Sequence, residues 1–172
     1  MIQRVQTVWM ALTAALVCVV IFMPAVSFSL GGADFDLMTY GIKSGPGPHS
    51  GVMLVYGGAE PAGEVVTSTL SICTVALLAL AALLPFVTIF MFGNRTLQAR
   101  LLGAEFALLT GGVALLGWTI FSTWRNVVAA MSENFFFSFF PLLLVVAMLT
   151  NWFAIRGVLR DEIMVRAADR IR

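Results

Sequence analysis

Glu105 is the residue whose type and surroundings in this sequence most suggest chemistry. It is the only Asp, Glu, Lys, Arg or His inside the four long apolar segments of the chain, 8–28, 67–92, 101–123 and 135–155. An acid within a membrane-length apolar segment is costly to bury and is a functional candidate by default. The uncharged polar residues of the same segments include Thr13, Ser71, Thr74, Thr88, Thr110 and Asn151.

Glu105 has a structural and a functional interpretation. It follows Arg100 by five residues, which is about 7 Å along a helix and puts it near one membrane surface. The partners expected at that surface are Arg4, Arg100, Arg156, Gln6 and Asn151. We expect the structural role of a paired acid, and a proton-transferring or substrate-binding role is the alternative.

No other residues form a catalytic or metal-binding pattern. Membrane enzymes use two or more convergent groups, and this sequence has one histidine, His49, and no paired acids at helical spacing. Cys18 and Cys73 lie in apolar segments rather than in the exposed loop where a disulfide framework would place them. A net charge of +1 gives no basic field for nucleic acid. We therefore predict no enzymatic activity, no cofactor, no metal and no nucleic-acid partner.

The composition places these residues in a membrane protein. Hydrophobic residues make up 60% of the chain and charged residues 11%, with a mean hydropathy of +0.96. That leaves too little polar surface for a water-soluble domain. Each apolar segment reaches the length of about 20 residues that a helix needs to cross a bilayer. We predict an all-α membrane protein with four transmembrane helices in a single domain over 1–172.

The arginines predict the orientation of these helices. Short cytoplasmic loops carry an excess of Lys and Arg. With four spans, one side receives eight arginines and the other receives only Lys43 and Arg125. The eight are Arg4, Arg95, Arg100, Arg156, Arg160, Arg166, Arg170 and Arg172. Both termini are therefore expected in the cytoplasm, and the outer loop 29–66 on the opposite side.

The outer loop has strand character. Its stretches 34–42 and 51–57 carry β-favouring residues and flank the turn-forming sequence KSGPGPHS. We expect a small two-stranded β-ribbon, which would have to pack on the outer helix ends because it is marginal alone. The glycine-rich turn lacks the sequence context of a phosphate-binding loop.

Prolines and small residues bear on helix packing. A helix from Pro141 to Arg156 would rise only about 22 Å, so we expect the sequence FFFSFF at 135–140 to belong to the same membrane helix. Pro85 is expected to be tolerated inside its own helix. A row of small residues should let a neighbouring helix approach closely. The row consists of Gly103, Ala107, Gly111 and Ala114.

Three polar stretches carry a family resemblance: MIQRVQTVW at the start, NRTLQARL at 94–101 and RDEIMVRAADRIR at the end. Together they resemble an uncharacterised family of small bacterial four-helix inner-membrane proteins, a domain of unknown function. The resemblance covers the whole chain in order. It implies a multi-pass location in the bacterial cytoplasmic membrane, and it implies no activity, cofactor or catalytic residue.

The tail 156–172 contains five arginines and three acids, a net charge of +2. Leu159, Ile163 and Ala167 recur every four residues, which gives a helix a weak apolar face. The charge is too low for a polybasic lipid anchor. We expect a C-terminal cytoplasmic helix that docks against protein, and a solvated charged end is the alternative.

Two functional hypotheses follow. The first is a non-enzymatic accessory or scaffold subunit of a larger membrane complex, which binds a membrane-protein partner through its cytoplasmic face. Its candidate contact residues are Arg4, Arg95, Gln98, Arg100, Arg156, Arg160, Arg166 and Arg170. The second is a small transporter or lipid-binding protein with an inner-leaflet pocket around Glu105 and Asn151. Besides the bilayer itself, bound lipids are therefore among the expected partners.

Overall fold

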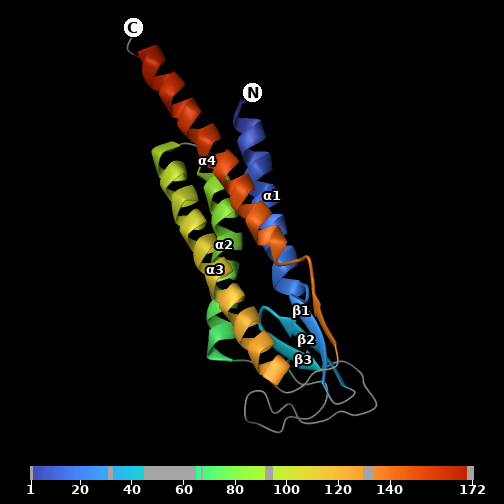
Figure 1. Ribbon diagram of the computed structural model, residues 1–172. Coiled ribbons are helices and arrows are strands. Elements are labelled where there is room, and N and C mark those ends of the chain that lie inside the picture. The colour runs from blue at the N-terminus through green and yellow to red at the C-terminus, as the bar shows by residue number, and fades with distance from the viewer. Residues whose placement is uncertain are drawn as a thin grey trace.

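The computed structural model describes residues 2–30, 33–44, 65–66, 68–91, 95–129 and 134–169. In these residues four helices form an antiparallel bundle and short strands form a sheet at one end of it (Figure 1). The helices are α1 (Ile2–Phe22), α2 (Thr69–Phe90), α3 (Arg95–Ala129) and α4 (Leu142–Asp169). The strands are β1 (Val26–Leu30), β2 (Ala33–Met38), β3 (Gly41–Ser44), β4 (Val65–Val66) and β5 (Asn134–Phe137).

The helices match the predicted spans in number and in apolar character. Within the described residues, four helices are long and apolar enough to cross a membrane, so the chain is a multi-pass membrane protein. The 22 residues of α2 rise about 33 Å, close to the thickness of a bilayer core. Each helix packs on two neighbours, α1 on α2 and α4, and α3 on the same two. The bundle is therefore a closed ring of four helices.

Side-chain hydrogen bonds fix the helix ends. The Ser68 hydroxyl accepts a hydrogen bond from the Ser71 backbone N–H at 3.1 Å and caps the start of α2. At the end of α1, the Thr39 hydroxyl lies within hydrogen-bond distance of the Val20 and Ile21 carbonyls. These bonds satisfy backbone groups that a helix end leaves without partners.

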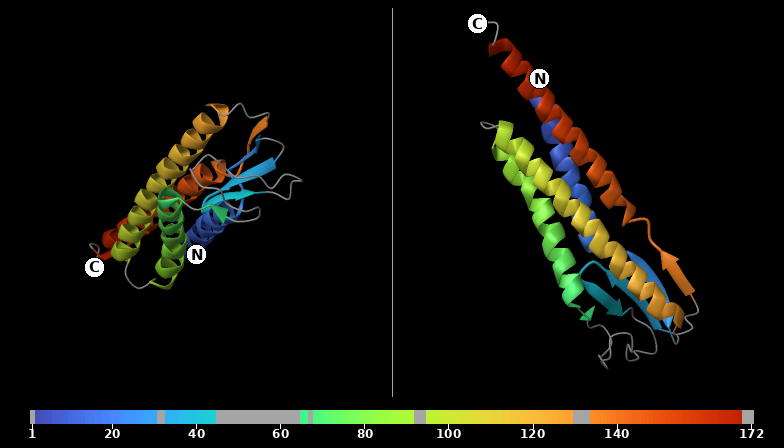
Figure 2. Two further views of the ribbon diagram at one scale, coloured as in Figure 1. Left: turned by 90° about the horizontal axis from the view of Figure 1, so that it is seen from below. Right: turned by 60° about the vertical axis from the view of Figure 1, so that its left-hand side comes forward.

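The described strands form one five-stranded antiparallel sheet in the order β4-β3-β2-β1-β5. Its inward side chains alternate along the strands, as period-two geometry requires, and Val26, Phe28, Phe35, Leu37 and Ile42 are buried. Figure 2 shows the sheet at the end of the bundle opposite the chain termini. The expected ribbon is therefore a larger sheet, although the predicted strand 51–57 lies outside the described residues.

Two predicted helix boundaries are wrong. The first segment was expected to remain helical through 28, but α1 ends at Phe22 and Val26–Leu30 form β1. The aromatic sequence at 135–140 was expected in a membrane helix, but Asn134–Phe137 form β5, which pairs with β1. Pro141 then directly precedes α4, where a proline without an N–H costs little. A short apolar run does not distinguish a membrane helix from a buried strand.

The last helix also differs from the expected layout. The predicted tail helix exists, but it continues the membrane helix without a break, because α4 runs from Leu142 to Asp169. The helix that follows Pro141 is long enough to cross a membrane because it extends past Arg156, and not because it begins before Pro141.

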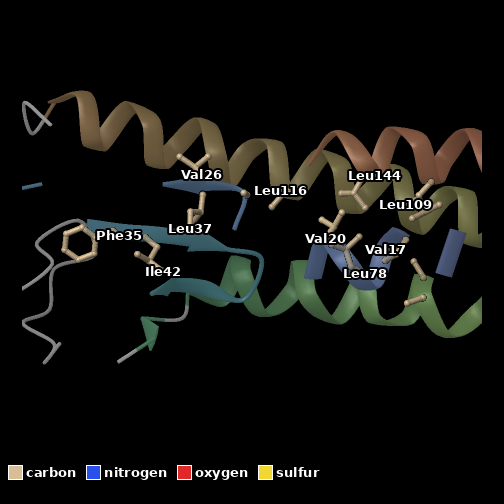
Figure 3. Close-up of a cluster of buried hydrophobic side chains, with 14 of the residues drawn as sticks. Val17, Val20, Val26, Phe35, Leu37, Ile42, Leu78, Leu109, Leu116 and Leu144 are labelled. Carbon is tan, nitrogen blue, oxygen red and sulfur yellow. The ribbon is translucent and has the colours of Figure 1, made fainter. Parts of the chain in front are cut away.

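The buried apolar side chains form two clusters. The larger extends from the middle of the bundle into the sheet, from Val17 and Leu78 to Leu37 and Ile42 (Figure 3). The smaller comprises Met10, Leu102, Ala154 and Val158 near the chain termini. The sheet thus shares a continuous core with the helices and is not a separate unit.

The closest contact between α2 and α3 is at a glycine beside the predicted row of small residues. Within the row, Gly111 faces α2, where a Cβ would lie 3.4 Å from Leu77 Cδ1. Gly103, Ala107 and Ala114 are exposed on α3, and a methyl group at Gly103 would meet nothing within 4 Å. A Cβ at Gly112 would instead lie 2.5 Å from Leu78 Cδ2 on α2. Gly112 is therefore the residue that lets α2 and α3 approach closely.

Candidate functional site

A layer of polar side chains separates the two apolar clusters. We call it the polar layer, and its members are Thr13 on α1, Glu105 on α3, and Thr150 and Asn151 on α4. On each of these helices the polar residue lies between a member of the larger cluster and a member of the smaller one, as Thr13 lies between Val17 and Met10. All four side chains are buried, and Glu105 is 0% exposed.

The two threonines connect α1 to α4. Their hydroxyl oxygens lie 2.8 Å apart, and either can donate to the other. The hydroxyl that accepts in this bond can donate to a carbonyl of its own helix, Trp9 O for Thr13 and Ala147 O for Thr150, each at 2.9 Å. This half of the layer has its hydrogen-bonding groups satisfied.

Glu105 and Asn151 form the other half. The Asn151 amide interacts with the Glu105 carboxyl, yet no atom pair of the two meets hydrogen-bond geometry, and both carboxyl oxygens and both amide atoms have no partner among the described residues. Of the predicted partners, Arg100 and Arg156 are exposed, and Gln6 lies against Gly157. The side chain of Arg4 is not among those that the structure describes. Asn151 is thus the expected partner that the structure places beside Glu105.

The polar layer holds a single acid. In the described part of the chain no three His, Cys, Asp or Glu side chains gather as metal ligands. Buried polar atoms without hydrogen-bond partners cost free energy. The Glu105–Asn151 pair therefore either lowers the stability of the folded protein or serves a function that compensates for that cost.

A groove opens between α1 and α4 at the end of the bundle that carries the chain termini. We call it the α1–α4 groove; it encloses about 450 Å³ and is lined by Val5, Gln6, Trp9, Phe153, Arg156, Gly157, Arg160 and Met164. The Trp9 and Phe153 rings lie 5.4 Å apart at their centroids. The Arg156 guanidinium lies 5.3 Å from the centroid of the Trp152 ring, a cation–π distance. The α1–α4 groove therefore has apolar walls and two arginines, Arg156 and Arg160, at its edge.

The structure brings together some of the predicted contact residues. Arg156 and Arg160 share the groove, and Arg100 is exposed on α3 at the same end of the bundle. Gln98 is 8% exposed, and its Nε2 donates to the Thr88 carbonyl at 3.1 Å. That bond satisfies a carbonyl at the end of α2 and gives Gln98 a role inside the fold rather than on a contact surface.

Three of the predicted arginines are placed only by their backbone. Arg4 lies in α1, Arg95 begins α3 and Arg166 lies in α4. Arg170 lies outside the described residues. All three helix positions are at the end of the bundle where the termini lie (Figure 1).

Sequence reasoning missed most of the groove. Val5, Trp9, Phe153, Gly157 and Met164 are not among the site residues that the sequence predicts. The residues of the groove that the sequence does single out are Arg156 and Arg160, as cytoplasmic contact residues, and Gln6, as a partner of Glu105. The groove exists because α1 crosses α4, and no local pattern encodes that crossing.

The comparison with curated proteins finds no match for this chain. The family comparison supports the expected membership of an uncharacterised family. The model that matches, described as a domain of unknown function, spans residues 2–171. The chain therefore belongs to the family of the domain of unknown function DUF4293.

Proposed function

We propose that this protein is a non-enzymatic accessory or scaffold subunit of the bacterial inner membrane, which binds a partner protein through the cytoplasmic end of α4. The observation that carries this proposal is a helix end that extends past the start of α3 with a broad arc of exposed apolar side chains.

The extension begins where α4 passes the start of α3. The Thr96 hydroxyl donates to Glu162 Oε1 at 3.4 Å, so Glu162 is level with the first turn of α3. The residues 163–169 continue for about 10 Å, past the start of α3 (Figure 1). Ile163, Met164 and Val165 in this extension are 66%, 50% and 43% exposed. Because successive helical residues point about 100° apart, these three form a broad apolar arc of about 200° around the helix.

The neighbouring charges favour protein over hydrocarbon as the cover. An apolar arc of this width on a helix is normally buried. Five charged residues surround this turn: Arg160, Asp161, Glu162, Arg166 and Asp169. Charged groups at such density are costly in a bilayer interior. Apolar residues ringed by charged ones are typical of the centre and rim of a protein interface.

The predicted orientation supports a cytoplasmic location for the extension. The arginine-rich segments meet at the end with the termini, and cytoplasmic segments are enriched in such residues. Aromatic residues gather toward both ends of the bundle: Trp9 and Trp152 at the end with the termini, and Trp118, Phe121 and Trp124 toward the sheet. Such belts are typical of the two membrane interfaces.

The competing hypothesis placed a transport or lipid-binding pocket around Glu105. Glu105 is enclosed by the bundle and is not among the residues that line the α1–α4 groove. The arrangement therefore favours a structural role for the polar layer.

A photo-crosslinking residue at Ile163 tests the docking proposal. In living cells it should give a discrete protein adduct, whereas the same probe at Val146, which is exposed on the bundle part of α4, should not.

With the captured partner purified, Ile163→Ser combined with Val165→Ser should weaken binding at least tenfold, since buried apolar anchors dominate interface energies. Ala167→Ser, which puts a hydroxyl in the same turn without removing a large apolar group, should change binding less than twofold. Equal adducts from both probe positions, or no loss in the double variant, would refute the proposal.

A further inference from the structure

We propose that the α1–α4 groove is a binding site for one anionic glycerophospholipid of the inner leaflet, with an acyl chain against its apolar wall and the phosphate beside Arg156 and Arg160. This site adjoins the proposed protein-docking extension and shares Met164 with it, but its test does not depend on that docking.

The wall of the groove has the chemistry of an acyl-chain site. Trp9 and Phe153 supply apolar surface on the bilayer side of Arg156, and Val5 lies beside them. Val5 and Phe153 are themselves 56% and 50% exposed. The groove is formed by two helices whose apolar windows, Val5–Phe22 and Leu142–Val165, are long enough to cross a membrane. Its volume of about 450 Å³ is within the range of about 300–1,000 Å³ that small-ligand sites occupy. Hydrocarbon chains are the apolar molecules that surround such helices.

The cations give the site its charge preference. Arg156 and Arg160 are four residues apart on α4, so they follow one another on one helix face about 6 Å apart, and both line the groove. The nearby acid Glu162 is directed toward α3, where it accepts from Thr96. Two guanidinium groups at the edge of an apolar groove are complementary to a phosphodiester, whose oxygens can accept paired N–H bonds from arginine.

A buried polar group at the groove has no partner of its own. Gln6 is 6% exposed and lines the groove, and its Nε2 has no hydrogen-bond partner among the described residues. A Cβ at Gly157 would lie 2.9 Å from Gln6 Cγ, so the missing side chain at 157 is what makes room for this glutamine between α1 and α4. A lipid oxygen that reached this nitrogen would satisfy it, whereas an apolar occupant would leave it unpaired.

Native mass spectrometry of the purified full-length chain tests the proposal, with phosphatidylglycerol and phosphatidylcholine of identical acyl chains added to the detergent. The wild type should retain one phosphatidylglycerol and bind it more tightly than phosphatidylcholine. Arg156→Gln combined with Arg160→Gln should weaken phosphatidylglycerol binding about 25-fold, at about fivefold for each arginine near a membrane surface. Phosphatidylcholine binding should change little. Arg100→Gln, at an exposed arginine outside the groove, is the matched control and should change either affinity less than twofold.

A second pair of variants tests the groove independently of its charge. Val5→Trp fills the groove and should reduce binding of both lipids at least tenfold. Val8→Trp makes the same change three residues further along α1, at a residue that is 64% exposed and outside the groove, and should leave binding unchanged. Equal affinity of the wild type for the two lipids would refute the proposal, as would unchanged phosphatidylglycerol binding in Val5→Trp. Retention of a second protein chain in place of lipid would also overturn it.

Discussion

Glu105 shows how a residue can be identified from sequence while its partner is decided by packing. Its isolation in an apolar segment marks it at once. The structure places it opposite Asn151, with the oxygens of both side chains buried and without hydrogen-bond partners in the described residues. The two side chains face each other between α3 and α4. They lie at the level where the Thr13–Thr150 hydrogen bond connects α1 to α4.

Substitutions of Glu105 should separate its structural contribution from a chemical one. Glu105→Gln keeps the shape and the hydrogen-bonding capacity, so assembly and function should survive. A loss of about 1–3 kcal/mol in the free energy of unfolding of Glu105→Leu would show that the two side chains are paired in the folded protein, because a buried amide left without its partner costs that much. The double variant Glu105→Leu, Asn151→Leu should be more stable than the single one, since neither polar group then remains alone.

Reversible unfolding in a detergent mixture measures this cycle. A coupling energy below about 0.5 kcal/mol, the level expected of independent sites, would show that the two residues do not act together. If Glu105→Gln abolished function at normal abundance and assembly, the acid itself would be required and the structural interpretation would be wrong.

At the scale of elements, the contact between α2 and α3 depends on one glycine. Gly112→Leu should destabilise the bundle by about 1–3 kcal/mol, the typical cost of overpacking a core, because its Cβ would meet the fully buried Leu78 at 2.5 Å. Gly103→Leu is the matched control on the same helix, where a Cβ meets nothing within 4 Å.

Thermal unfolding of both variants in the same detergent provides the comparison. The midpoint of Gly112→Leu should fall well below that of the wild type, and that of Gly103→Leu should stay close to it. Equal midpoints for the two variants would show that α2 and α3 are not packed closely at Gly112.

At the scale of the whole molecule, the distribution of arginines predicts the direction of insertion. Cysteine labelling tests this in a chain whose own cysteines are replaced by Cys18→Ser and Cys73→Ser. Lys43→Cys places an exposed thiol on β3 of the sheet, and Arg100→Cys places one on α3 at the opposite end. A membrane-impermeant maleimide with verified access to the periplasm should label the first in intact cells. It should label the second only after the inner membrane is lysed, and the reverse pattern would invert the topology.

Some features of the molecule follow from local sequence. The number of membrane-length helices could be predicted because apolar length is a property of each segment alone. The helical tail was predicted from the spacing of Leu159, Ile163 and Ala167, and the structure confirms it as the end of α4. Isolation within an apolar run identified Glu105 for the same reason.

The sequence by itself therefore determined the class of protein, the set of helices and the concentration of arginines at one end. Only the tertiary structure decided what required distant segments to meet. Phe135–Phe137 become a strand because β1, more than a hundred residues earlier, offers them its edge, and the backbone must be hydrogen-bonded wherever water is excluded. The α1–α4 groove and the place of Gln6 against Gly157 arise in the same way, since the space between two helices is set by their crossing and not by either sequence alone.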